Sequence, residues 1–181
     1  MLKKILIIGY NVIRFIGKKS YKNILFVSPS TKIAIDKSAY CLVDNNFRTR
    51  NNVEINVREK AKLIIDDNVF INSNTIITCR DKIYIGKNTI IAPNVMIFDH
   101  DHKIKNGRVL HNDYELDEII IGENVWIGAG SIILRGSKIG DNSIIAAQSV
   151  VKGEIPSNTI YIQSRNLNLK DINERRYIFE V

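Results

Sequence analysis

Cysteine and aromatic residues are scarce in this chain of 181 residues. The two cysteines, Cys41 and Cys79, do not suggest the disulfide framework of a small secreted domain. A reducing compartment is therefore the simple expectation, and Cys79 is expected to be packed in the interior. Aromatic residues make up 8% of the chain and hydrophobic residues 45%, which favours a core of stacked isoleucine and valine over a core of rings.

Acidic residues are missing from the start of the chain, where none precedes Asp36. The segment from 1 to 32 is basic and has a large apolar share, but it lacks the roughly 20 apolar residues of a transmembrane helix and an A-x-A-like signal cleavage site. We expect residues 1–32 to pack as a cap on the fold in a cytoplasmic protein. The alternative is that the segment also contacts an anionic membrane surface, peripheral to the inner face of the membrane.

A six-residue repeat dominates the C-terminal half of the chain. Isoleucine or valine returns at every sixth position, at Ile121, Ile127, Ile133, Ile139, Ile145 and Val151. The fourth position of these hexads accepts positive φ at a tight corner, being Asn124, Gly130, Gly136 or Asn142. Simple strands alternate with period two and helices space apolar residues by three and four. A period of six instead predicts an all-β solenoid, in which three hexads make one triangular turn.

The repeat also extends upstream, with one two-residue offset at Ile83-Tyr84. Hexads begin at Ile65, Ile71, Ile77, Ile85, Ile91 and Ile97, with corners at Asn68, Asn74, Asn88 and Asn94. Residues 33–62 carry weaker repeats, so an irregular first turn is expected there. The predicted β-helix domain spans residues 33–162. The tail at 163–181 has acids early and bases late, which suits a short helix.

The periodicity stops between Phe98 and Glu118, where the segment is polar, charged and aperiodic. Such a segment cannot form a solenoid face, and we interpret residues 98–118 as a loop extruded from one corner. Long loops on rigid scaffolds often carry function. All three histidines of the chain, His100, His102 and His111, lie in this loop.

Two motifs identify a family. Residues 124–156 read NVWIGAGSII-x(4)-KIGDNSIIAAQSVV-x(3)-IP, and residues 85–102 read IGKNTIIAPNVMI-x(4)-H. They resemble the hexapeptide-repeat acyltransferases, specifically the sugar O-acetyltransferases related to galactoside and maltose acetyltransferases and to polysaccharide-modifying relatives. The resemblance covers about residues 63–160. It implies a left-handed parallel β-helix, an exception to the usual right-handed crossover. It also implies a homotrimer with acetyl-coenzyme A in the groove between neighbouring subunits.

The chemistry implied by this resemblance needs a base. A sugar hydroxyl is a poor nucleophile unless its proton is removed as it attacks, and an imidazole with a reference pKa of about 6.5 suits that task. Aligning IAPNVMIFDHDH with the catalytic turn of the family, without a gap, places the catalytic histidine on His102. His100 is the rival, and Asp99 and Asp101 flank both. We group Asp99 and His100 with the substrate-binding residues.

The resemblance also indicates acceptor-binding positions. Asn72 stands where the galactoside-type enzymes use asparagine to hold the acceptor sugar, although a plain corner asparagine is an equal alternative. Where those enzymes place an acceptor-binding aspartate, this chain has Arg80 beside Asp81. This departure leaves the acceptor open, and a cation there would suit an acidic sugar or a phosphate.

Five positions are candidates for contact with coenzyme A. Ala129 and Ala147 match positions whose backbone meets the pantetheine arm in the family. Trp126 matches the tryptophan of the NVWIG motif, with exterior packing as its alternative role. Lys152 lies one residue before the usual coenzyme A lysine. Arg165 replaces part of a family motif near the end of the repeat and is a candidate phosphate contact.

The prediction is therefore an acetyl-coenzyme A-dependent O-acetyltransferase that modifies a sugar hydroxyl of a cell-surface polysaccharide or glycan precursor, without a metal. An amino-sugar N-acetyltransferase is the nearest rival, because the same base can serve an amine. Other classes are a zinc enzyme using His100, His102 and His111, as in carbonic-anhydrase-type hexapeptide proteins, and a non-catalytic assembly solenoid. The pI of about 9.4 suggests nucleic-acid binding, but no recognition motif accompanies the basic residues.

Overall fold

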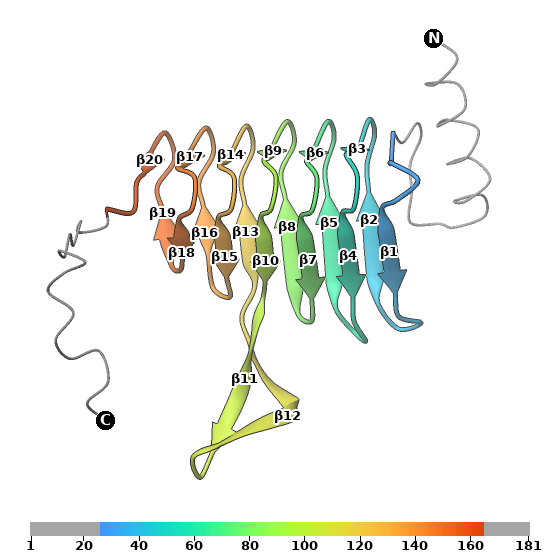
Figure 1. The fold of residues 1–181 in the computed structure, drawn as a ribbon, viewed down its shortest axis with the longest axis vertical. Coiled ribbons are helices and arrows are strands. Elements are labelled where there is room, and N and C mark those ends of the chain that lie inside the picture. Colours follow the sequence, from blue (N-terminus) through green and yellow to red (C-terminus); the bar gives the residue numbers. More distant parts are fainter. Residues whose placement is uncertain (1–25, 165–181) are drawn as a thin grey trace, which may run out of the picture.

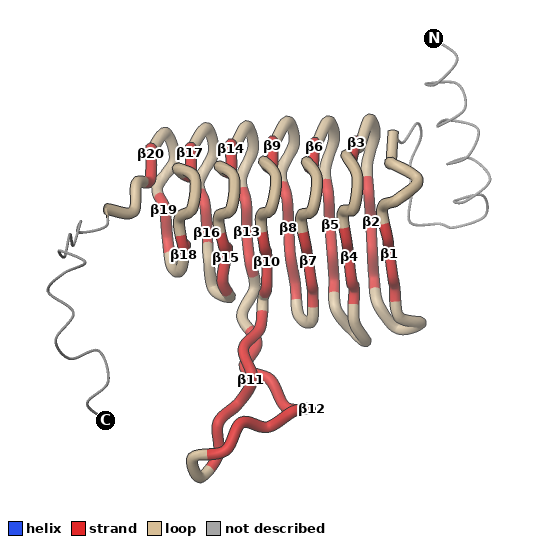
Figure 2. Tube along the Cα trace, viewed as in Figure 1, coloured by secondary structure: helices blue, strands red, loops and turns tan. Residues whose placement is uncertain are grey.

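The structure is a computed structural model that describes residues 26–164. The predicted tail helix, Arg165 and most of the predicted N-terminal cap lie outside these residues. Within them the chain winds into a left-handed parallel β-helix, as predicted, with a two-stranded hairpin projecting from one side (Figure 1). Figure 2 shows short strands separated by tight corners along the whole length. No helix among the described residues could span a membrane.

Three parallel six-stranded sheets form the faces of the solenoid. Sheet 1 consists of β1 (Lys32–Ile35), β4 (Glu54–Val57), β7 (Ile76–Cys79), β10 (Met96–Phe98), β15 (Ile132–Leu134) and β18 (Val150–Val151). Sheet 2 consists of β2 (Tyr40–Val43), β5 (Lys62–Ile65), β8 (Lys82–Ile85), β13 (Ile119–Ile121), β16 (Lys138–Ile139) and β19 (Glu154–Ile155). Sheet 3 consists of β3 (Arg48–Thr49), β6 (Phe70–Ile71), β9 (Ile90–Ile91), β14 (Trp126–Ile127), β17 (Ile144–Ile145) and β20 (Ile160–Tyr161). One strand from each sheet in turn makes one coil.

The interior is a stack of β-branched side chains. Residues in the strands alternate between inward and outward, and the inward residue of each coil pairs in register with the inward residue of the next. Ile91, Ile127 and Ile145 make such a column in sheet 3 and have no exposed surface. The core is therefore aliphatic, and Cys41 and Cys79 are buried in it as free thiols, in agreement with the packing predicted for Cys79.

The corners have the backbone conformation that the repeat predicted. All eight predicted corner residues have positive φ, namely Asn68, Asn74, Asn88, Asn94, Asn124, Gly130, Gly136 and Asn142. Along the corner between sheets 2 and 3 the asparagine amides also bond to one another, as from Asn88 to Asn124 at 3.0 Å and from Asn124 to Asn142 at 3.1 Å. Asparagine thus relieves the steric cost of the turn and ties each coil to the next.

Small residues follow the inward isoleucine because adjacent coils nearly touch there. A Cβ added to Gly128 would lie 2.5 Å from the backbone nitrogen of Ala147, inside van der Waals contact. The same limit applies at Gly122 and Gly140, whose added Cβ would also lie within 3.0 Å of the next coil.

The first coils differ from the irregular turn that we predicted for residues 33–62. They are regular but longer, with equivalent residues 22 apart, as in Asn46 and Asn68, against 18 apart in the later pair Asn124 and Asn142. The strands of sheets 1 and 2 have four residues in these coils, as in β4 and β5, and later shorten to two or three. Two added residues on each of sheets 1 and 2 interrupt the six-residue period in the sequence. The inward side chains still stack in register from coil to coil.

The segment predicted as a loop at residues 98–118 is an antiparallel hairpin of β11 (His100–Lys105) and β12 (Arg108–Leu116). It leaves the solenoid at the corner between sheets 1 and 2, so its extrusion from a corner is as predicted. Its turn is Asn106-Gly107, with φ of 52° and 71°. An Asn-Gly pair is a strong hairpin signal because both residues accept positive φ, and the sequence reasoning overlooked it.

We predict that Ile127→Ala lowers the free energy of unfolding by about 2 to 5 kcal/mol, because Ile127 is fully buried between two coils and truncation leaves a cavity. Urea titration at fixed protein concentration measures this change. The control is Ile104→Ala, at a side chain that is 71% exposed, with an expected change below about 1 kcal/mol. Equal losses in the two variants would contradict the buried column as the main source of stability.

Candidate functional site

A buried carboxylate lies at the corner where the hairpin leaves the solenoid. Asp99 has no exposed surface. Its oxygens accept hydrogen bonds from the backbone amides of Arg80, at 2.8 and 3.0 Å, and Asp81, at 2.8 Å. A buried charge needs such partners to offset its lost hydration. Within the described chain Asp99 therefore ties the hairpin to the preceding coil and presents no surface for the substrate contact that we predicted.

His100 is the next residue in the chain, and its imidazole contacts this carboxylate. Its Nδ1 lies 3.2 Å from Asp99 Oδ1, and 14% of its side chain is exposed. The imidazole packs edge-on against Phe98 and Tyr114, with centroids 6.0 and 5.5 Å away. A carboxylate accepts the Nδ1 proton, and in the neutral imidazole Nε2 is then the acceptor. His100 is thus oriented by Asp99 and mostly enclosed.

His102 lies two residues further along β11 and is exposed. Its Nδ1 lies 2.9 Å from the carbonyl oxygen of Leu110 on β12. A carbonyl can only accept, so Nδ1 carries a proton, and in the neutral imidazole Nε2 has the lone pair. The ring also packs against Tyr114, at 4.8 Å and a tilt of 42°. An exposed imidazole with a fixed basic nitrogen has the arrangement that a general base needs.

Tyr114, which the sequence reasoning missed, joins the site together. It pairs opposite His102 in the hairpin, contacts both histidines, and lies 3.9 Å beneath the guanidinium of Arg80. The Asn106-Gly107 turn predicts a hairpin but not this pairing, because the register shifts between Ile104 and His102. One aromatic ring therefore connects the histidines to the cation that the sequence predicted at the acceptor position.

Ion pairs fix the hairpin against the later coils. Arg135 donates through Nε to Asp101 on β11 at 2.6 Å and through an Nη to Glu115 on β12 at 2.5 Å. One guanidinium thus holds both strands near their bases, which limits how far His102 can swing.

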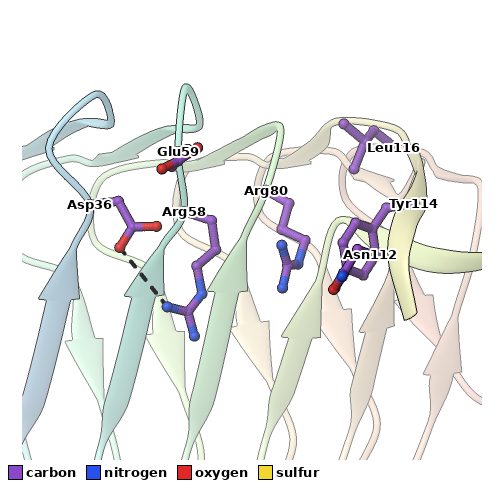
Figure 3. Close-up of a pocket in the computed structure, with 7 residues that line it drawn as sticks. All are labelled: Asp36, Arg58, Glu59, Arg80, Asn112, Tyr114 and Leu116. Carbon is purple, nitrogen blue, oxygen red and sulfur yellow. Dashed lines mark ion pairs between the residues drawn. The ribbon is translucent and has the colours of Figure 1, made fainter. Parts of the chain in front are cut away.

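A cavity of about 370 Å³ opens between the hairpin and the first coils (Figure 3). Its lining consists of Asp36, Arg58, Glu59, Arg80, Asn112, Tyr114 and Leu116. Arg80 lines this cavity, and its role in acceptor binding stays a prediction. Asp81 is not in the lining, and burial together with the charge of Asp99 raises its pKa.

The predicted site residues occupy different corners of the triangle. His100, His102, Arg80 and Lys152 lie at the corner between sheets 1 and 2. Three others lie at the corner between sheets 3 and 1, namely Asn72, Ala129 and Ala147. Trp126 is 51% exposed on the outer face of sheet 3. One chain therefore does not bring Asn72 to His102.

The side-chain amide of Asn72 makes a local hydrogen bond. The side chain of Asn72 accepts from the amide of Ser73 at 2.8 Å, which accounts for an asparagine at that corner.

Burial raises the pKa of the Cys79 thiol, and the neighbouring Asp99 raises it further. Cys79 therefore stays protonated and does not supply a thiolate nucleophile.

The histidines do not gather as a metal site within one chain. In the described part of the chain, the group of three or more potential ligands that lie close together is Asp44, Asp66 and Asp67, which contains no histidine. His102 and His100 instead have their Nδ1 atoms engaged by a carbonyl and a carboxylate. A zinc site of three histidines would need ligands from more than one chain.

The repeats and the fold match known proteins. The family described as "Bacterial transferase hexapeptide (six repeats)" matches residues 118–153. "Putative acetyltransferase YJL218W" of Saccharomyces cerevisiae is 43% identical over 55% of this chain and 51% of its own length. "Galactoside O-acetyltransferase" of Escherichia coli is 35% identical, over 64% and 57%. "Putative lipopolysaccharide biosynthesis O-acetyl transferase WbbJ" of Escherichia coli is 28% identical, over 75% and 74%.

Solved structures share the architecture. A maltose O-acetyltransferase from Clostridium difficile superposes with a TM-score of 0.51 at 28% identity, over 83% of this chain and 67% of that one. AntD, an N-acyltransferase from Bacillus cereus, has a TM-score of 0.70 at 20% identity over 85% and 83%, which shows a common fold alone.

The class defined by these observations is the triangular β-helix built from six-residue repeats. Residues 118–153 carry the hexapeptide transferase repeat, and the chain is similar to acetyltransferases that share this fold, as its motifs indicated. It spans from about half to about three quarters of the length of these curated relatives.

We predict that Asp99→Asn destabilises the protein by about 1 to 3 kcal/mol, because an amide in place of the carboxylate cannot accept every hydrogen bond that Asp99 now receives. Chemical denaturation measures the change. The control is Asp101→Asn, which weakens an exposed ion pair and should cost less than about 1 kcal/mol. If the control is the more damaging variant, the exterior clamp on the hairpin matters more than its buried base.

Proposed function

We propose that this chain is an acetyl-coenzyme A-dependent O-acetyltransferase that acetylates a sugar hydroxyl of a cell-surface polysaccharide or a glycan precursor. The observation that carries the proposal is the placement of His102, whose Nδ1 is bonded to the Leu110 carbonyl and whose ring packs against the cavity residue Tyr114. Relatives named as galactoside and lipopolysaccharide O-acetyltransferases support the reaction class and the sugar acceptor.

In the proposed reaction, Nε2 of His102 takes the proton of the sugar hydroxyl as its oxygen attacks the thioester carbonyl of acetyl-coenzyme A. A carbon–oxygen bond forms, the carbon–sulfur bond breaks, and the proton passes to the leaving thiolate. Backbone N–H groups stabilise the oxyanion. The Leu110 carbonyl and the Tyr114 ring hold the imidazole in one orientation through both steps.

His100 and Asp99 are assigned a supporting role. His100 is bonded to a buried carboxylate and is mostly enclosed, so we propose that it positions Tyr114 and the base of the hairpin. The acceptor lies in the cavity lined by Arg80 and Tyr114.

For coenzyme A we propose contacts with Ala129 and Ala147, where small side chains let a ligand approach the backbone. Lys152, which is exposed, is proposed to meet its phosphates, and Arg165 and Trp126 remain candidates.

The enzyme is proposed to work as a homotrimer. The cofactor candidates Ala129 and Ala147 lie at a different corner from His102, so a site that uses both combines two chains. The active site then forms where the hairpin of one subunit meets the alanine corner of its neighbour.

We predict that His102→Ala lowers kcat by about 10² to 10⁴, the usual loss when a general base is removed. His100→Ala should retain substantial activity. The measurement is mass-spectrometric detection of acetylated product from purified protein, acetyl-coenzyme A and a panel of neutral, acidic and amino sugars. Calorimetry with coenzyme A is the control for an intact fold. An inactive His100→Ala beside an active His102→Ala would overturn the assignment, and products acetylated on amines alone would favour the N-acetyltransferase.

The shared site can be tested by complementation. His102→Ala and Ala147→Trp should each be inactive, because one lacks the base and the other blocks the proposed cofactor groove. Trimers that contain both variants should regain activity at about one third of their sites, since one of their three interfaces combines the intact halves of two chains. Light scattering should report a trimer throughout. A stable, active monomer, or the absence of rescue in verified mixed trimers, would refute the intersubunit site.

A further inference from the structure

Two arginines face the cavity beside the histidines without an acid partner at hydrogen-bonding distance among the described residues. Arg58 and Arg80 occupy the same place on neighbouring coils, directly after Val57 and Cys79, which pair in the sheet register. Neighbouring parallel strands lie about 4.8 Å apart, so the two cations are stacked one coil from each other. Figure 3 shows both side chains on the same wall of the cavity.

The hydrogen-bonding capacity of these guanidinium groups is not used up by the described chain. The Nε–H of Arg58 and that of Arg80 are both buried and donate to no described atom. The nearest carboxylate oxygen to Arg58 belongs to Asp36, 4.0 Å from an Nη, which is too long for a hydrogen bond. A buried donor without an acceptor is costly and calls for an explanation, of which a ligand is one.

The arrangement of Arg80 leaves its binding edge open. Its guanidinium lies 3.9 Å above the ring of Tyr114. Stacking uses the face of the planar group, whereas the N–H groups project from the edge, in the fork that binds carboxylates and phosphates bidentately. The same tyrosine packs against His102, so a group bound by Arg80 is one side chain away from the proposed base.

The acidic groups of the cavity lie beside Arg58, where Asp36 forms a long ion pair of 4.0 Å, and away from Arg80. Asp36 and Glu59 line it on the side of the first two coils, whereas Arg80 and Tyr114 lie beside the hairpin (Figure 3). Asn112 and Leu116 complete the lining on the hairpin side. Carboxylates, an amide and an aromatic ring suit the hydroxyls and apolar faces of a sugar, and the two arginines suit an oxyanion attached to it.

From this geometry we infer that the acceptor is an anionic sugar, whose carboxylate or phosphate binds between Arg58 and Arg80. The inference rests on the proposed function for the identity of the cavity as the acceptor site. The shared chemistry is a planar or tetrahedral oxyanion held by two guanidinium groups. A uronic acid and a sugar phosphate are two sources of it, and the experiment separates them.

The test is calorimetric binding to the full-length protein at low salt, with no acetyl transfer involved. The probes are glucuronate, glucose 1-phosphate and neutral glucose, with inorganic phosphate as a fourth. At least one charged sugar should bind about tenfold or more tightly than glucose, since hydrogen bonds to charged groups exceed 1.4 kcal/mol, the equivalent of tenfold. The better charged probe identifies the source, and added salt should weaken its binding.

Arg58→Gln with Arg80→Gln should remove the preference for the charged sugar and leave the affinity for coenzyme A unchanged. The matched control is Arg50→Gln, at an exposed arginine that lies outside the cavity lining and should keep the preference. Arg80→Lys keeps the charge without the fork and should lose several-fold of the affinity, so a single folded variant also tests the inference.

Equal binding of charged and neutral sugars to the native protein would overturn the inference. So would an unchanged preference for the charged sugar in the folded double variant. A parallel loss of coenzyme A affinity in that variant would also overturn it, because it would assign the arginines to the cofactor. Failure here is distinct from failure of the proposed function. Acetylation of neutral sugars with undiminished kcat/KM would refute the anionic acceptor and still support the acetyltransferase. Anion binding without any acetyl transfer would support the anion site and refute the acetyltransferase.

Discussion

The narrow interior of the solenoid is the constraint on which the rest of the molecule depends. Each inward residue must stack on its equivalents in the coils before and after it, at the spacing set by the backbone hydrogen bonds between parallel strands. Isoleucine and valine fill that column without voids, as Ile91, Ile127 and Ile145 do with no exposed surface. Because all three sheets share this interior, no strand can be omitted from one coil without leaving a cavity.

This constraint explains why the site is at a corner. An insertion between two strands leaves the sheets intact only where the chain already turns, and the hairpin arises between β10 and β13 while both keep their partners in the stack. Asp99 takes an inward place there, in a column where earlier coils have Val57 and Cys79. A carboxylate is tolerated at that point because two backbone amides of the preceding corner, at Arg80 and Asp81, donate to it.

The sequence was most informative where the structure repeats. Six-residue spacing predicted the β-helix, and asparagine and glycine predicted every corner that was named, because positive φ restricts the residue type directly. The longer first coils were read as irregular because extra residue pairs interrupt a period without changing the alternation. The hairpin was interpreted as a loop, although the Asn106-Gly107 pair predicts a hairpin turn. The burial of Asp99 and the contacts of Tyr114 depend on register between distant segments, which no local pattern contains.

The step in coil length also produces the concave surface that a solenoid otherwise lacks. A uniform triangular prism has flat faces and convex corners, with no cleft for a sugar. Here the coils shorten from 22 residues in the first turns to 18 and then 16 in the last, and the hairpin emerges within that change. Arg58 and Arg80 of the longer coils line one side of the cavity at the corner between sheets 1 and 2. Tyr114 and Asn112 of β12 line the other side. The lengthened strands that obscured the repeat in the sequence are therefore the ones that form a wall of the cavity.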